Sequence, residues 1–159
     1  MAGSTTKKAV VQRFDRQVLF GYVNSISFLQ LTGVELLSAE GQVAVVPYAD
    51  IKTVAFVRDF ESGAVPARRV FHTRPKMDGL WVRLQFRDGD VMEGILPNNL
   101  LQLEAYGFTV IPPDPYSNNQ RVFIPRTALR AVEVLGVVGS PLKKKGKPVP
   151  KEQIGLFEE

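Results

Sequence analysis

The sequence predicts an all-β protein that contains one small strand-rich unit twice. A similar phrase occurs in both halves, as VVPYADIKTVAFV at residues 45–57 and as FIPRTALRAVEVL at residues 123–135. Apolar and polar residues alternate along LWVRLQF at residues 80–86, which is typical of a half-buried strand. Clusters of glycine, proline, asparagine and aspartate separate such stretches, as expected of tight turns.

Landmark residues occur in the same order in both halves. They are Gly21, Leu-Gln-Leu at 29–31 and Pro47 in the first half, and Gly94, Leu-Gln-Leu at 101–103 and Pro125 in the second. The offsets are 94 − 21 = 73, 101 − 29 = 72 and 125 − 47 = 78 residues, and the largest change falls in the turn-forming stretch PPDPYSNNQ. We therefore predict a tandem duplication. The alternative is two unrelated β meanders with similar turns.

The first elements of each half are predicted to form a hairpin. In the second half it spans residues 80–96 and turns at Asp88-Gly89, where glycine permits a positive φ. The corresponding stretch at 9–23 is one residue shorter at its turn and has no glycine there. Gly21 and Gly94 lie within strand pattern, where a missing side chain permits a bend or bulge.

Three further strands complete each predicted unit. The third lies within FLQLTGVELL at 28–37 and LLQLEAYGFTVI at 100–111. Pro47 and Pro125 fix φ and lack an N–H, so each suits the start of a single turn between the last two strands. Five strands in about 50 to 60 residues bury both sheet ends only as a small, curved barrel.

The predicted organisation is a first barrel at 8–60, a basic linker at 61–79, a second barrel at 80–138 and a flexible Lys/Pro tail at 139–159. A unit of about 60 residues buries little core on its own. The two barrels are therefore expected to pack together and to unfold together.

Residues 82–96 together with 123–135 resemble the Sm and Sm-like family, which includes Hfq-like proteins, and the first half follows the pattern more loosely. The resemblance implies five-stranded bent barrels, oligomers formed by pairing of edge strands, and single-stranded RNA bound by loop residues. The family's third-strand loop normally carries Asp a few residues ahead of Asn. Here the loop carries Asn98 and Asn99 without that Asp.

Composition limits the function classes. The 159-residue chain has no cysteine, one histidine and a net charge of +4, which permits an anionic partner. No signal-like or membrane-spanning apolar run occurs, so a soluble, cytoplasmic protein is expected. No nucleophile and base pair, phosphate loop or metal-ligand spacing is evident, and we expect no enzymatic activity, cofactor or metal.

A nucleic-acid site is predicted from basic residues interleaved with an aromatic ring and from the asparagine loop. Its residues are Arg68, Arg69, Phe71, Arg74, Lys76, Asn98, Asn99, Lys143, Lys144 and Lys145. The alternative for the linker is that its apolar residues cover the interface between the barrels and leave the arginines in water. The lysines equally suit a solubilising tail.

The tail ends in QIGLF, which resembles the pentapeptide by which bacterial proteins dock on the DNA sliding clamp. Gln153, Ile154, Leu156 and Phe157 are the candidate partner-binding residues, unless they dock on the protein's own barrels. Two hypotheses follow: a non-catalytic binder of single-stranded RNA or other nucleic acid, or a protein-interaction adaptor that uses its sheet edges or this segment.

Overall fold

The computed structural model describes residues 5–61, 69–113 and 119–139. Its elements are strands and short 3-10 turns, so the all-β class is confirmed. The first half contains β1 Thr6–Arg13, β2 Val18–Asn24, β3 Gly33–Leu37, β4 Val43–Pro47, η2 Tyr48–Asp50 and β5 Ile51–Val57. The second contains β6 Gly79–Phe86, β7 Val91–Leu96, η3 Leu100–Gln102, β8 Gly107–Val110, β9 Asn119–Pro125, η4 Arg126–Ala128 and β10 Leu129–Val138.

The turns follow the chemistry of their residues. Pro47 and Pro125 have extended backbones, with φ of −60° and −63°, and each is followed directly by a 3-10 turn and the last strand of its half. Gly89 has a φ of 96° in the β6–β7 hairpin. In the β1–β2 hairpin the left-handed position falls on Arg16, with a φ of 73°, so this hairpin forms without glycine.

Gly21 and Gly94 are required by close strand packing. A Cβ atom on Gly21 would lie 2.7 Å from the carbonyl oxygen of Leu37, and one on Gly94 would lie 2.8 Å from the Cβ atom of Val110. Leu37 belongs to β3 and Val110 belongs to β8, which are the third strands of the two halves. The glycines therefore let that strand cross closely over the second strand.

The expected third strands are shorter than predicted. Of the first Leu-Gln-Leu triplet, Leu29 forms only an isolated bridge to Val34, and β3 starts at Gly33. The second triplet begins at Leu101, inside the 3-10 turn η3, which starts where Asn99 caps the backbone N–H of Leu101. This local cap explains why the helical turn replaces the start of the strand.

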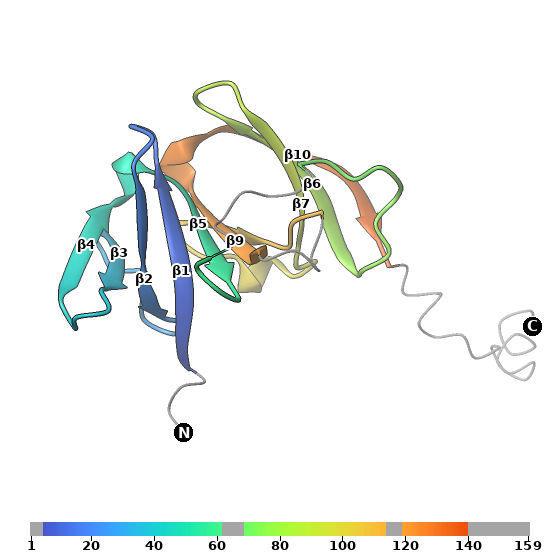
Figure 1. The fold of residues 1–159 in the computed structure, drawn as a ribbon. Coiled ribbons are helices and arrows are strands. Elements are labelled where there is room, and N and C mark those ends of the chain that lie inside the picture. Colours follow the sequence, from blue (N-terminus) through green and yellow to red (C-terminus); the bar gives the residue numbers. More distant parts are fainter. Residues whose placement is uncertain (1–4, 62–68, 114–118, 140–159) are drawn as a thin grey trace, which may run out of the picture.

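The prediction of two separate five-stranded barrels was wrong. The described strands form a seven-stranded sheet in the order β4-β3-β2-β1-β5-β9-β8 and a three-stranded sheet in the order β10-β6-β7. Neither sheet closes into a barrel. Instead, β5 of the first half pairs with β9 of the second, so one sheet contains strands of both halves. An isolated bridge between Ile95 and Ile111 connects β7 to the residue that follows β8. Figure 1 shows β4 at one side of the molecule and β6 and β7 at the other.

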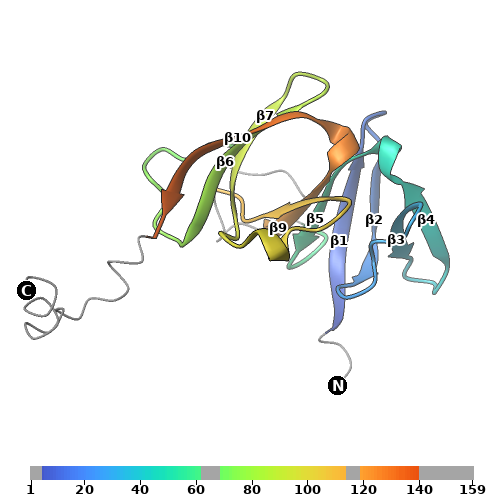
Figure 2. The same ribbon diagram turned by 180° about the vertical axis from the view of Figure 1, so that it is seen from behind.

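The same strand order nevertheless occurs in both halves. If the bridge between Ile95 and Ile111 is taken to make β8 and β7 neighbours, the strand order of the second half is β9-β8-β7-β6-β10. This order matches β4-β3-β2-β1-β5 of the first half. The β5–β9 pair joins these two series into one continuous order of strands, with β4 at one end and β10 at the other. Figure 2 shows β5 and β9 side by side in the middle of this arrangement.

The hydrophobic cores of the halves interlock. Phe123, on β9, is fully buried in the core formed mainly by β1 to β5, where its ring packs edge to face on Phe28 at 5.8 Å. Conversely, Val10, Ala55 and Val57 of the first half belong to the core formed mainly by the second. Each half therefore completes the other's core. Within the described residues, no helix is long and apolar enough to cross a membrane.

Candidate functional site

The described part of the predicted linker lies against the three-stranded sheet. The carbonyl of Arg69 accepts a hydrogen bond from the N–H of Glu93 on β7, at 2.7 Å. The N–H of Phe71 and the indole N–H of Trp81 both donate to Oε1 of Glu93, each at 3.0 Å. The buried Glu93 carboxylate thus fixes the linker to the sheet.

The predicted linker residues make contacts within the chain. Arg69 forms an ion pair with Asp90 at 3.3 Å, and Arg74 donates to the carbonyl of Val137 at 2.6 Å. The ring of Phe71 packs edge to face on Trp81, while Lys76 is exposed. These contacts favour a structural role for the linker, and its binding of nucleic acid stays a prediction.

Two further predicted site residues, Asn98 and Asn99, lie just before η3. Asn98 is exposed in the β7–η3 loop, and the side chain of Asn99 accepts the N–H of Leu101. The remaining candidates lie outside the described residues: Arg68, Lys143, Lys144, Lys145, Gln153, Ile154, Leu156 and Phe157. Among the described candidates, the linker residues and the two asparagines therefore belong to different segments of the chain, and the nucleic-acid site stays a prediction.

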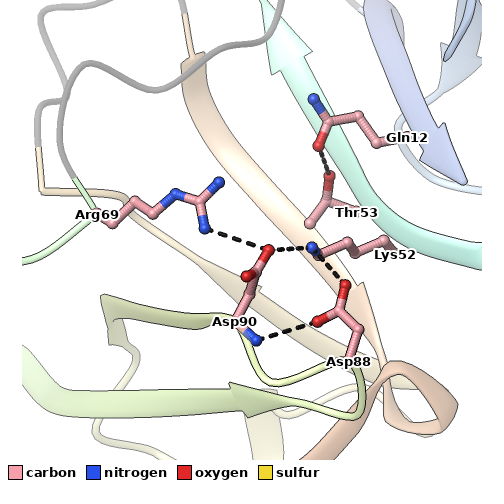
Figure 3. Close-up of polar contacts among 6 residues, drawn as sticks. All are labelled: Gln12, Lys52, Thr53, Arg69, Asp88 and Asp90. Carbon is pink, nitrogen blue, oxygen red and sulfur yellow. Dashed lines mark hydrogen bonds and ion pairs between the residues drawn. The ribbon is translucent and has the colours of Figure 1, made fainter. Parts of the chain in front are cut away.

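A cluster of charged side chains joins the two halves (Figure 3). Lys52, at the start of β5, lies between Asp88 and Asp90 of the β6–β7 turn, and its Nζ donates to Asp88 at 2.8 Å and also to Asp90. Arg69 approaches Asp90 from the linker side. Nearby, the hydroxyl of Thr53 donates to the side chain of Gln12 at 3.2 Å. The contacts of Lys52 with Asp88 and Asp90 therefore connect β5 of the first half to the β6–β7 turn of the second.

The cluster shifts the pKa values of its members. Desolvation lowers the pKa of Lys52, but its hydrogen bonds to Asp88 and Asp90 outweigh this and leave the pKa raised above 10.5. Desolvation raises the pKa of Asp88, but the hydrogen bond from Lys52 leaves it below 3.8. For Asp90 the hydrogen bond from Lys52 is the main cause of a lowered pKa. Both carboxylates are more than a third exposed, so water screens these interactions.

Replacing Lys52 by Met is expected to destabilise the chain by about 1 kcal/mol or less at neutral pH, in the range of partly exposed ion pairs. The depressed carboxylate pKa values mean that the contribution is present above pH 3.8 and is lost as the pH falls through their lower folded-state values. The raised pKa of Lys52 means that it is also lost above pH 10.5. Urea unfolding of the wild type and Lys52→Met at several pH values measures the difference, with the exposed Lys76→Met as control. A difference that does not shrink in acid would contradict this assignment.

A basic groove crosses the strand ends where the two halves meet. One hollow of about 480 Å³ is lined by residues that include Lys7, Phe28, Phe56, Gln120 and Arg121. A second, shallower hollow shares Lys7 and Gln120 and adds Lys8 and Arg58. The two hollows therefore adjoin across the start of β1, the end of β5 and the start of β9. We call this surface the junction groove.

The junction groove combines positive charge with aromatic rings. Lys7 and Arg121 are exposed and form no ion pair with another described residue. Phe28 and Phe56 pack edge to face at 5.4 Å in its wall. The acidic residue in the lining is Glu104, whose carboxylate accepts a hydrogen bond from Thr109 at 2.9 Å. Basic side chains thus outnumber acidic ones along the groove, which favours an anionic ligand.

Sequence reasoning missed this groove because its basic residues are far apart in the chain. Lys7 and Lys8 precede a strand pattern, Arg58 follows one, and Arg121 begins another. Their proximity depends on the β1–β5 and β5–β9 pairings. The available signal was that each of these charges lies at one end of a predicted strand, but only the pairing between halves places the ends together.

Comparison with known proteins gives one match. Residues 5–136 match the family of unknown function DUF6982. The chain belongs to this family. The matched range includes β1 to β9 and most of β10, so it covers both halves together. No curated protein and no solved structure matches the chain.

Among the described residues, no group of three or more His, Cys, Asp or Glu is arranged to hold a metal ion.

Proposed function

We propose that this protein binds single-stranded nucleic acid, without catalysis, in the junction groove. The observation that carries the proposal is the meeting of Lys7, Lys8, Arg58 and Arg121 beside Phe28 and Phe56 where the two halves join. Cationic side chains in a groove attract a phosphate backbone, and aromatic side chains favour unstacked bases. The resemblance of the halves to the Sm and Sm-like family supports the same ligand class.

The groove suits a single strand better than a duplex. Its more enclosed hollow holds about 480 Å³, which is within the range of sites for small ligands of about 300–1,000 Å³. Gln120 and Ser25 line it beside the cations, and their polar groups can bond to bases or sugars. We expect weak sequence selectivity, because phosphate contacts carry no sequence information.

Replacing Lys7 and Arg121 together by Glu is expected to weaken binding of a mixed-sequence single-stranded RNA at least about tenfold at low salt. The slope of log K against log salt should also fall in magnitude by about 1.4, because each lost phosphate contact on a single strand accounts for about 0.7. Fluorescence anisotropy titrations at several salt concentrations measure both effects.

Two control variants locate the binding surface. Arg130→Glu alters an exposed arginine on β10, outside the groove, and should reduce affinity much less than the groove variant. Arg69→Ala with Arg74→Ala tests the linker. If the linker variant abolishes binding and the groove variant does not, the groove is not the site. Absence of binding by the wild type at low salt would overturn the proposed function.

A second candidate function is that of a protein-interaction adaptor. It is favoured by large apolar side chains exposed on the loops after the second strand of each half, including Ile26 and Leu31 at 82% and Leu101 at 95% exposure. The QIGLF segment stays a prediction for the same function. Titration of a peptide covering residues 148–159 with a bacterial sliding clamp tests it, and loss of binding on Leu156→Ala with Phe157→Ala is the expected result.

A further inference from the structure

The second strand of the second half holds a piece of the linker against its side that faces away from β6. The N–H of Glu93 on β7 donates to the carbonyl of Arg69 at 2.7 Å. Two residues further on, the N–H of Ile95 donates to the carbonyl of Ile111 at 3.0 Å. Alternate N–H groups of β7 thus point away from β6, as they do in an antiparallel ladder. The linker satisfies one of them.

Side chains fix the linker at this position. The ring of Phe71, two residues after Arg69, packs edge to face on Trp81 at 6.2 Å. The N–H of Phe71 donates to the carboxylate of Glu93, which is 7% exposed. A backbone hydrogen bond followed by an aromatic side chain two residues later is therefore what holds this segment of the chain on β7.

The strand β2 is the equivalent of β7 in the first half. Val10 lies opposite Phe20 in the β1–β2 hairpin, and Arg83 lies opposite Glu93 in the β6–β7 hairpin. Both members of these pairs are related by the same offset, 83 − 10 = 73 and 93 − 20 = 73 residues. The two hairpins therefore share one register, so the N–H of Phe20 points away from β1 as that of Glu93 points away from β6.

No described strand lies beside Phe20 on that side. β3 pairs with β2 at Leu37 and Tyr22, and β3 ends at Leu37, so Val18 and Phe20 lie beyond its end. Val18 is 43% exposed and Phe20 is 51% exposed. Phe60 packs edge to face on Phe20 at 5.8 Å and on Tyr22 at 5.6 Å, which covers one side of these rings and leaves half of Phe20 open.

We propose that this surface of β2, formed by Val18 and Phe20 and called here the β2 seat, binds a short peptide segment of another protein in the way that β7 holds the linker. The N–H of Phe20 donates to a carbonyl of the peptide, and an aromatic side chain two residues further along packs on the open ring of Phe20. Main-chain hydrogen bonds to a strand combined with a side-chain contact are a common mode of peptide recognition.

The β2 seat differs from its counterpart in the side chains that select the peptide. Phe20 replaces the buried carboxylate of Glu93. Gln17 replaces Asp90, which forms an ion pair with Arg69 at 3.3 Å, and both accept the same hairpin hydrogen bond through their carbonyls. Without either carboxylate, an arginine in the peptide has no partner at the equivalent places. The partner peptide is therefore apolar and aromatic rather than basic.

The probe is a blocked synthetic peptide with the linker sequence 69–73 in which Arg69→Ala removes the charge. It is titrated into the full ¹⁵N-labelled chain, without nucleic acid, so the result is independent of binding in the junction groove. The amide signal of Phe20 should shift and saturate with a Kd of about 1 mM or tighter. The same peptide with Phe71→Ser should produce no saturable shift.

Two substitutions in the β2 seat and one outside it locate the binding. Phe20→Glu and Val18→Glu should each weaken binding at least about tenfold, because a charge then lies against the apolar peptide. Both positions are exposed, so a wild-type circular dichroism spectrum is expected for each. Leu101→Glu, at an exposed position in η3 of the second half, should bind the peptide like the wild type.

The indole N–H signal of Trp81 reports the alternative, in which the added peptide displaces the chain's own linker from β7. That signal should stay unchanged on titration. A saturable shift at Trp81 without one at Phe20, no saturable shift at all, or unaltered affinity in folded Phe20→Glu and Val18→Glu would each overturn the proposal.

Discussion

Replacing Phe123 by Ala is expected to lower the free energy of unfolding by about 3–5 kcal/mol, the usual cost of truncating a fully buried phenylalanine. The ring belongs to β9 of the second half but lies at 0% exposure in the core of the first, against Phe28. Its removal leaves a cavity at the β5–β9 junction. Because the junction connects both cores, the loss should appear in the whole chain as one transition.

The single tryptophan makes this prediction measurable. Trp81 lies on β6 in the three-stranded sheet, away from the core that contains Phe123. Urea unfolding followed by Trp81 fluorescence and by far-ultraviolet circular dichroism should give coincident curves, both shifted by Phe123→Ala. Phe20→Ala is the matched control, because Phe20 is 51% exposed, and it should cause a smaller loss. An unchanged fluorescence midpoint in Phe123→Ala would show that the halves unfold independently.

Gly107→Ala is expected to destabilise the chain by about 3 kcal/mol, at the upper end of the cost of overpacking. A Cβ atom at Gly107 would lie 2.2 Å from the carbonyl oxygen of Ile124 and 2.9 Å from the ring of Phe123. The first of these is backbone, so relief requires β8 and β9 to move apart. That movement would disturb the strand that connects the two halves.

Gly136→Ala is the matched control for this substitution. Gly136 also lies in a strand, but the nearest atom to its Cβ position is 3.8 Å away, which is ordinary van der Waals contact. Thermal unfolding of both variants should show a large decrease in melting temperature for Gly107→Ala and a small change for Gly136→Ala. Equal effects of the two substitutions would mean that strand propensity, and not the close approach of β8 and β9, determines the cost.

Local features were predictable from the sequence because their causes are local. Proline lacks an N–H and fixes φ, which favours the end of a strand, and both Pro47 and Pro125 precede the predicted turns. The Asp88-Gly89 turn likewise depends on the positive φ that glycine adopts without strain. In the first hairpin the residue with positive φ is Arg16. No glycine therefore marked the position of that turn in the sequence.

The shared sheet was not predictable by the same reasoning. Strand alternation defines which residues face a core, but not which distant strands pair. The error was to pair the strands only within each half. A signal did exist: Val122, Phe123 and Ile124 are consecutive and all buried, and a continuous apolar run is typical of a strand covered on both faces. β9 is such a strand, because its two faces contribute to the two cores.

Binding in the junction groove is tested most directly by identifying the residues that a bound single-stranded nucleic acid contacts. Ultraviolet crosslinking of a photoreactive single-stranded RNA, followed by mass spectrometry of the peptides, reports this without any substitution. The junction groove predicts crosslinks at residues 6–8, 56–58 and 119–121, from the three strand ends that form it. Crosslinks confined to residues 69–76 and 98–99, or no crosslinks under conditions of measurable binding, would contradict the account.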